Sequence, residues 1–164
     1  MGYSNTWRRE RHTVPLSDRP TGCRREVVEG EGVMTMLDER QEAVFRGYDD
    51  GLIEFARELV RVRSYSGEEE GVARLVEAKM KELGYDEVFI DGTGNVVGRI
   101  GGGVRSVLFD SHMDTVEVND EGEWTLPPFG AEVRDGRLYG RGSVDMKSSL
   151  AASIYAAAAA RDLG

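Results

Sequence analysis

The chain contains 164 residues, 40% of them apolar and 31% charged, a balance typical of a soluble globular protein with one folded domain. Its net charge of −9 argues against a nucleic-acid-binding protein, because such proteins carry a basic face. No apolar run approaches the roughly 20 residues that a membrane helix requires, so we expect no membrane partner. The single cysteine, Cys23, allows neither an internal disulfide nor a cysteine-based zinc cluster, and it indicates a reducing, cytoplasmic location.

The first 36 residues differ in composition from the rest of the chain. Residues 1–25 contain six arginines but only two acidic residues, and they show neither helical nor alternating apolar spacing. We therefore predict a disordered extension over residues 1–36. Met34 and Met36 stand directly before the first periodic segment. Our hypothesis is that the native protein starts at one of these methionines, so that the extension is not native and the domain comprises residues 37–164.

Two amphipathic helices are expected next. Between residues 37 and 62, apolar side chains recur at steps of three and four residues, a spacing that predicts a helix. The stretch "RSYSGEEEG" interrupts this pattern. Ser66 followed by Glu69 matches a capping box, so we expect a second helix from there to about Leu83, ended by Gly84.

The segments that follow are predicted to be strands, turns and a last helix. "EVFI" and "VVGRI" flank the turn sequence "DGTGN", which predicts a hairpin over 87–100, and "SVLFD" (106–110) has the apolar continuity of a buried central strand. A second hairpin is expected in "AEVRDGRLYG", turning at Asp135 and Gly136, before an alanine-rich helix. This order predicts an α/β fold with a mixed, twisted sheet flanked by helices.

A histidine and an aspartate follow the predicted central strand. His112 and Asp114 are two residues apart, so both side chains can face one site at the carboxyl end of that strand. On spacing alone, His112 is either a metal ligand or a solvated or hydrogen-bonded loop histidine. Asp114 then has two possible roles, as a metal ligand or as the carboxylate that orients His112. Asp145 is a third candidate, because the glycines of "GRGSVDMK" allow a sharp turn into a cleft. These residues suit zinc, manganese or cobalt, but they are too few for a closed site.

Neighbouring residues each allow two readings. Asp110 either binds the metal or caps the end of the strand. Lys147 either neutralises an anionic substrate or is a solvated lysine near a helix start. Gly140 and Gly142 are expected to shape the backbone rather than to bind phosphate, because a phosphate-binding loop needs a different pattern.

Taken together, "SHMDTV", Trp124 and "PPFGAEVRDGRLYGRGSVDMKSSLAA" resemble the clan MH metallopeptidases. This family contains aminoacylase, acetylornithine deacetylase, succinyl-diaminopimelate desuccinylase and carboxypeptidase G. The resemblance covers residues 37–164, and it is specific because two separated motifs occur in order with a hairpin between them. The stretches "LVRVRSYSGEE" and "LGYDEVFIDGTGNVVGRI" look closest to the branch of the selenium-metabolism-linked hydrolase.

The resemblance implies a zinc-exopeptidase-like catalytic domain with a centre of two divalent ions, zinc first and cobalt or manganese as alternatives. His112 would bind one ion, and Asp114 would hydrogen-bond its imidazole as part of the catalytic machinery. Asp145 would bridge the two ions, and the peptide bond after it is often cis in the family. A metal-activated water would cleave an amide bond in an N-acyl amino acid, a small peptide or a related metabolite.

The sequence departs from the family in two places. Ser148 and Ser149 replace a frequent glycine pair, a change that a helix start tolerates. The family's base glutamate, its further ligands and its lid or dimerisation domain have no counterpart in the chain. We therefore expect the N-terminal part of a catalytic domain, incomplete at the C-terminus and inactive alone, whose full-length form is a homodimer.

The sequence can also be compared with two other classes of function, a non-catalytic module and a dinucleotide-binding domain. The alternative to a hydrolase fragment is a non-catalytic short form that acts as a metal-binding or protein-interaction module. A dinucleotide-binding domain is disfavoured, because no G-x-G-x-x-G motif opens a helix after the first predicted strand.

Overall fold

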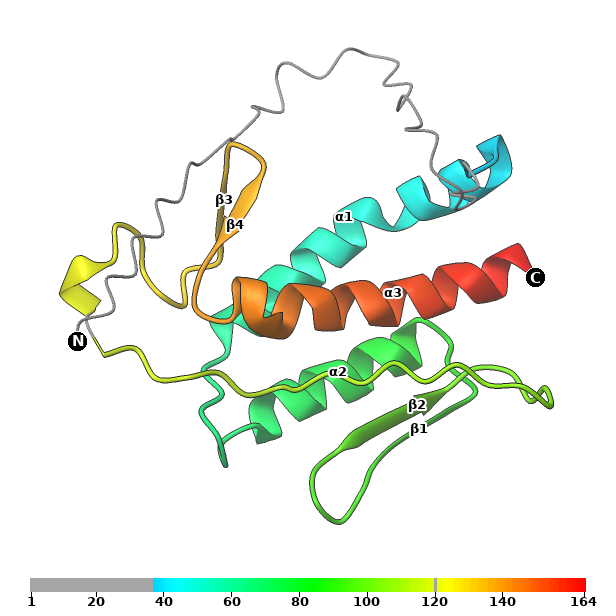
Figure 1. Ribbon diagram of the computed structural model, residues 1–164, viewed down its shortest axis with the longest axis horizontal. Helices are drawn as coiled ribbons and strands as arrows, with labels where there is room; N and C mark the ends of the chain where they lie inside the picture. Colours follow the sequence, from blue (N-terminus) through cyan, green and yellow to red (C-terminus); the bar gives the residue numbers. More distant parts are fainter. Residues whose placement is uncertain (1–36, 120) are drawn as a thin grey trace, which may run out of the picture. The chain divides into compact units, whose positions relative to one another are not determined.

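The computed structural model of the chain describes residues 37–119 and 121–164. The predicted extension over residues 1–36, with its two candidate start methionines, lies outside these residues. Within them, three α-helices and two hairpins contribute to one apolar core (Figure 1). The fully buried part of this core comes from the helices, whereas Val96 and Leu138 of the hairpins pack against it while partly exposed.

The first predicted helix is confirmed as α1 (Glu39–Arg61). It opens with a capping box that local spacing had not indicated. Asp38 Oδ1 accepts a hydrogen bond from the Gln41 backbone N–H at 2.8 Å, and Gln41 Oε1 accepts one from the Asp38 N–H at 2.9 Å. Phe55 and Leu59 lie on its buried face, as the three- and four-residue spacing predicts.

The second helix is confirmed as α2 (Glu70–Glu82), but its predicted capping box is wrong. The N-cap residue is Glu69, and its side chain makes no capping hydrogen bond. Ser66 instead donates to Asp114 Oδ2 at 2.6 Å. A carboxylate is a stronger hydrogen-bond acceptor than an uncharged group. The contact with Asp114 therefore determines how the Ser66 side chain is oriented. Gly84, with a φ of 75°, follows the end of the helix as predicted.

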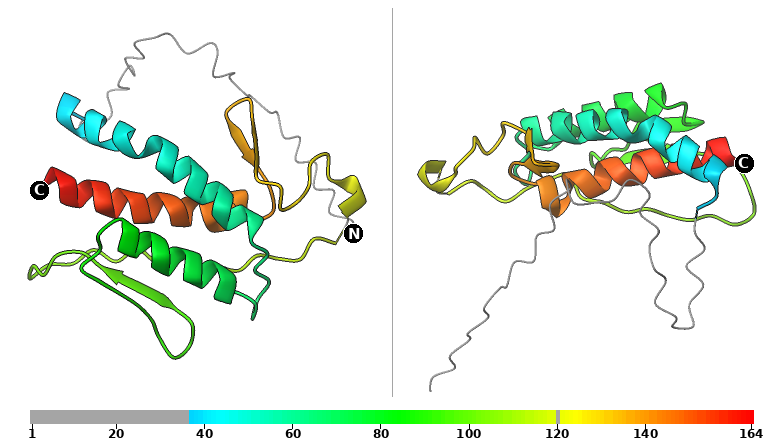
Figure 2. Two further views of the ribbon diagram at one scale, coloured as in Figure 1. Left: turned by 180° about the vertical axis from the view of Figure 1, so that it is seen from behind. Right: turned by 90° about the horizontal axis from the view of Figure 1, so that it is seen from above.

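The alanine-rich helix is confirmed as α3 (Ser148–Leu163), which runs beside α1 in all views (Figures 1 and 2). Ala151 and Ala158 are fully buried on its inner face. Tyr155 packs edge-on against Tyr48 of α1, with ring centroids 5.7 Å apart and planes at 79°. No helix within the described residues is long and apolar enough to cross a membrane.

Both predicted hairpins are confirmed. Strands β1 (Glu87–Ile90) and β2 (Val96–Arg99) pair antiparallel, as do β3 (Glu132–Arg134) and β4 (Arg137–Tyr139). The turn between β3 and β4 lies at Asp135 and Gly136, which have φ angles of 50° and 68°. Positive φ at both central residues is typical of the turn type that Asp-Gly favours in hairpins.

The α/β class is confirmed, but the described residues contain two separate two-stranded sheets rather than one mixed sheet. The predicted central strand at 106–110 has no strand partner in the described part of the chain, and Val107 and Leu108 are 81% and 88% exposed. A central strand needs a neighbour on each side, and each hairpin pairs only with itself. Further along this segment, Thr115 forms an isolated parallel β-bridge with Tyr65, which follows α1.

Candidate metal centre

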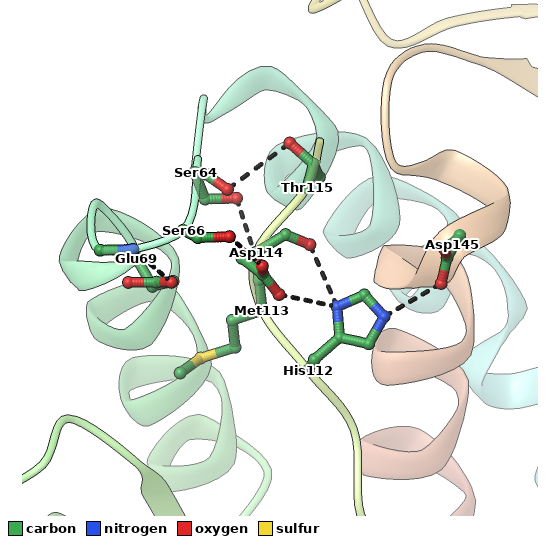
Figure 3. Close-up of polar contacts among 9 residues, drawn as sticks. Ser64, Ser66, Glu69, His112, Met113, Asp114, Thr115 and Asp145 are labelled. Carbon is green, nitrogen blue, oxygen red and sulfur yellow. Dashed lines mark hydrogen bonds and ion pairs between the residues drawn. The ribbon is translucent and has the colours of Figure 1, made fainter. Parts of the chain in front are cut away.

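The segment that carries His112 is anchored to the turn after α1 (Figure 3). The Thr115 backbone N–H donates to the Ser64 carbonyl oxygen at 2.7 Å, and the Ser64 hydroxyl donates to the Met113 carbonyl oxygen at 2.8 Å. Both Ser64 and Thr115 are buried. These hydrogen bonds fix the backbone on both sides of Asp114 relative to the end of α1.

Asp114 and Ser66 form a hydrogen-bonded chain to one nitrogen of His112 (Figure 3). His112 Nδ1 lies 3.0 Å from Asp114 Oδ1 and 3.1 Å from the Asp114 carbonyl oxygen. Both oxygens are acceptors, so Nδ1 must carry a proton to make these contacts. The geometry is that of a carboxylate that orients a histidine, the second of the two roles considered for Asp114.

Asp145 approaches the other nitrogen of the same ring. Its Oδ1 lies 3.0 Å from His112 Nε2 (Figure 3). Asp145 belongs to a kinked turn, η3 (Ser143–Lys147), where its φ of −126° and ψ of 96° are not helical, and its peptide bond to Met146 is cis. The side chain is 87% exposed, and Oδ2 makes no hydrogen bond to any other described residue. One carboxylate oxygen is therefore open to a further ligand.

The two glycines before Asp145 allow its turn to pack tightly. Gly142 has a φ of 78°, and a Cβ placed there would lie 2.5 Å from Thr115 Cγ2. A Cβ at Gly140 would overlap the Val60 side chain. Both positions therefore exclude larger residues for steric reasons, in agreement with the predicted role of these glycines in backbone shape.

Hydrogen bonding within this group shifts two pKa values in opposite directions. The hydrogen bond to Asp145 raises the pKa of His112 above its usual value, and the contacts with Asp114 act in the same direction. The hydrogen bond from Ser66 lowers the pKa of Asp114, with a further contribution from His112. Asp114 therefore stays ionised at neutral pH, as a carboxylate that accepts hydrogen bonds from both neighbours.

A cleft of about 300 Å³ opens at His112. Its lining comes from the His112 segment and the turn around Asp145, and comprises His112, Asp114, Thr115, Val116, Gly140, Arg141, Gly142, Ser143, Val144 and Asp145. All three predicted site residues therefore line one cavity. Asp110 does not line it, and its carboxylate makes no hydrogen bond to the described residues, so neither predicted role for Asp110 is seen.

Comparison with known families identifies a similarity to a family of hydrolases. The sequence profile described as "Peptidase family M20/M25/M40" matches residues 108–164. This range includes His112, Asp114 and Asp145, which approach one another in the structure. The match supports the family resemblance of the motifs, and it indicates a family of peptidases and related hydrolases.

Two curated relatives are similar to the chain. The uncharacterized protein YgeY of Escherichia coli K12 is 34% identical over 119 residues, which cover 73% of this chain and 30% of YgeY. A succinyl-diaminopimelate desuccinylase of Dechloromonas aromatica is 38% identical over 109 residues, or 65% of this chain and 29% of that enzyme. The chain thus spans about three tenths of the length of these relatives. The assignment to the selenium-linked branch stays a prediction.

The donor atoms suit the divalent metals on which M20/M25/M40 enzymes generally depend. His112 Nε2 and Asp145 Oδ1 point at each other, and an imidazole nitrogen with a carboxylate oxygen is a donor pair that zinc, cobalt and manganese accept. Within residues 37–119 and 121–164, no group of three or more histidine, cysteine or acidic side chains is arranged to hold a metal ion. His112 and Asp145 could therefore supply part of a metal site, but not all of its ligands.

Lys147 does not reach the cleft, and both sequence-based readings of it are wrong. Its side chain is fully buried, and Nζ donates to the carbonyl oxygens of Leu59 at 2.9 Å and Val62 at 2.6 Å. Burial lowers the pKa of Lys147 to about 8. These hydrogen bonds tie the turn that carries Asp145 to the C-terminal end of α1, so Lys147 positions the site from behind.

Two residues of the site were missed from sequence. The local spacing of Ser66 predicts a helix cap, and no local pattern marks Ser64. Their partners, Asp114 and Met113, lie 48 and 49 residues further along the chain. Local spacing cannot reveal such contacts, because they depend on how the segment after α1 packs beside the His112 segment.

Proposed function

We propose that residues 37–164 form part of the catalytic domain of a metal-dependent amidohydrolase of peptidase family M20/M25/M40. The observation that carries this proposal is the approach of His112 Nε2 to Asp145 Oδ1, 3.0 Å apart in a cleft within the range that the family profile matches. The family match and the similarity to a desuccinylase support an amide bond as the target. An N-acyl amino acid, a small peptide or a related metabolite is the proposed substrate.

In this proposal, His112 and Asp145 would hold divalent metal, Asp145 would be shared between two ions, and zinc is the first choice. The open Oδ2 atom of Asp145 supports the shared role. When bound, such ions polarise a carbonyl group and lower the pKa of a bound water. Asp114 holds a proton on His112 Nδ1, which would leave Nε2 to bind the metal, and Ser66 holds the Asp114 carboxylate in place.

The remaining parts of the site are proposed to lie outside the described residues. A general base and further acidic or histidine ligands would be needed for turnover, and none joins the His112 cleft in the described part of the chain. We propose that residues 37–164 alone are inactive, and that the full-length protein is a homodimer. A cytoplasmic location and the absence of nucleic-acid or membrane partners belong to the same proposal, supported by the single cysteine and the acidic composition.

A zinc titration of the chain by calorimetry tests the proposal. His112→Ala and Asp145→Asn each remove one proposed ligand, so zinc affinity should fall by roughly tenfold or more in each variant. Asp110→Asn is the matched control, because it removes a nearby carboxylate that does not line the cleft. Equal zinc affinity in the wild type and both ligand variants would contradict the proposal.

A protein-interaction module is a second candidate function, because one segment exposes apolar side chains. Val104, Val107, Leu108 and Phe109 are each more than half exposed, in an extended segment without a strand partner among the described residues. Analytical ultracentrifugation tests this candidate. Association that Leu108→Glu weakens would favour it, and a monomer at all concentrations would count against it.

A further inference from the structure

We propose that Arg141 forms an anion-binding site beside the His112–Asp145 pair and anchors the carboxylate of the amide substrate. The identity of the ligand rests on the proposed hydrolase function. The binding itself requires neither a metal ion nor turnover, so it can be tested separately. The proposal is carried by the position, the cation–π contact and the unpaired N–H groups of one guanidinium group.

Arg141 lines two clefts. It lines the cleft of about 300 Å³ that contains His112 and Asp145. It also lines a second cleft, of about 410 Å³, together with Asn119, Glu123, Trp124 and Thr125. Arg141 is therefore the residue that the two clefts have in common.

A cation–π contact with Trp124 restricts the position of the guanidinium group. Its central carbon lies over the Trp124 ring, 5.1 Å from the ring centroid. The backbone of Arg141 is also held, because its N–H donates to the Pro128 carbonyl oxygen at 2.6 Å. Stacking occupies the face of a guanidinium and leaves its N–H groups on the edges available to acceptors.

Those N–H groups lack acceptors in the described part of the chain. Arg141 Nε is buried and has no hydrogen-bond partner there. No ion pair joins Arg141 to a described carboxylate, even though Glu123 lines the same cleft. A buried donor without an acceptor is rare in folded proteins and calls for an explanation. By contrast, Arg57 uses its donors on Glu54 and on the Ala131 carbonyl oxygen, as a structural arginine does.

The charge of the cleft makes Arg141 the natural anchor for an anion. Among the ten residues that line the His112 cleft, Arg141 is the only lysine or arginine, whereas Asp114 and Asp145 are acidic. An anionic group that enters the cleft therefore meets one cation, presented as a planar fork. A carboxylate matches that fork in size and geometry, with two parallel N–H···O hydrogen bonds.

NMR titration of the 164-residue chain with two small probes tests the inference. N-Acetylglycine carries a carboxylate, and N-acetylglycinamide has the same shape without the charge. We expect N-acetylglycine to shift the Arg141 Nε–Hε resonance saturably and to bind about tenfold or more tightly than the amide. Arg141→Met and Arg141→Lys should each weaken its binding by about tenfold or more, because lysine lacks the planar fork.

Arg134→Met is the matched control, because Arg134 is an exposed arginine that pairs with Glu132 on β3. It should bind N-acetylglycine like the wild type. Equal affinity in the wild type and the Arg141 variants, equal affinity for both probes, or no saturable binding would each overturn the inference. If Arg141→Met does not fold, Arg141→Lys and the wild-type resonance still decide the outcome.

The two proposals fail in different ways. Carboxylate binding that depends on Arg141, in a full-length protein that hydrolyses no N-acyl amino acid, would count against the hydrolase function and leave the anion site in place. Hydrolysis with a KM unaffected by Arg141→Lys would support the function and overturn the role of Arg141.

Discussion

At the scale of single residues, hydroxyl and carboxylate groups around His112 form a continuous chain of hydrogen bonds. Ser66 donates to Asp114, Asp114 accepts from His112 Nδ1, and Nε2 of the same ring faces Asp145. Each contact restricts the orientation of the next side chain. The ring is therefore held with Nδ1 toward Asp114 and Nε2 toward Asp145, before any ligand arrives.

Ser66→Ala tests this chain of hydrogen bonds without a metal ion. The hydrogen bond from Ser66 is the main cause that lowers the pKa of Asp114, so its removal should raise that pKa. Carbon-13 NMR of the Asp114 carboxyl group measures the change. Ser153→Ala is the control, because the Ser153 hydroxyl only bonds the Leu150 carbonyl oxygen within α3. An unchanged Asp114 titration in Ser66→Ala would contradict this account.

Lys147→Met tests the anchor behind the site. The variant removes both hydrogen bonds from Nζ and leaves the carbonyl oxygens of Leu59 and Val62 without that donor. We expect the free energy of unfolding in urea to fall by about 1–3 kcal/mol. Lys81→Met, which removes an exposed lysine paired with Glu77, should change it little. Equal stability of the two variants would show that Lys147 is no anchor.

At the scale of elements, the β1–β2 hairpin is fixed by a tight contact with α2. Gly98 of β2 faces Met80 and Tyr85, and a Cβ at this position would lie 2.5 Å from Met80 Sδ. The strand therefore approaches the helix more closely than a residue with a side chain would allow. The hairpin was predictable from its turn sequence, but this contact was not.

Gly98→Ala should disrupt that contact. We expect a loss of about 1–3 kcal/mol in the free energy of unfolding, because the methyl group overpacks the strand against α2. Gly92→Ala provides the comparison, since a Cβ there meets nothing within 4 Å. Thermal and urea unfolding of both variants measure the difference. If Gly98→Ala is as stable as Gly92→Ala, the close packing of the hairpin on α2 is refuted.

The turn of the same hairpin predicts a pH dependence. Asp91 accepts hydrogen bonds from Thr93 and Asn95, and those bonds lower its pKa. Because the folded-state pKa lies below the unfolded value, this stabilisation is present above the unfolded pKa. It is lost as the pH falls through the folded pKa. The Asp91 carboxyl resonance should therefore titrate below the usual aspartate range, and a normal midpoint would contradict the turn geometry.

At the scale of the whole molecule, local patterns predicted the elements but not their assembly. The helices and hairpins follow from apolar spacing and from turn residues such as Asp135-Gly136, which act over a few positions. The central strand at 106–110 was predicted from its apolar run alone, and strand pairing depends on partners far along the chain. Lys147 was misread for the same reason, because its acceptors lie 85 and 88 residues away.

In the candidate site, too, short-range patterns were predictable and long-range contacts were not. Two-residue spacing correctly placed His112 and Asp114 together, and the motif resemblance brought in Asp145, 33 residues further along the chain. The supporting contacts of Ser64, Ser66 and Arg141 depend on packing between segments, which no local pattern encodes.

Nitrogen-15 NMR of the His112 ring, recorded with and without zinc, tests the central claim most directly. At a pH where the ring is neutral, we predict a proton on Nδ1 in both samples. Zinc should shift the Nε2 resonance alone, because Nδ1 is held by Asp114 while Nε2 faces Asp145. A spectrum that zinc leaves unchanged, or a shift that appears at Nδ1 instead, would contradict the assignment of His112 as a metal ligand.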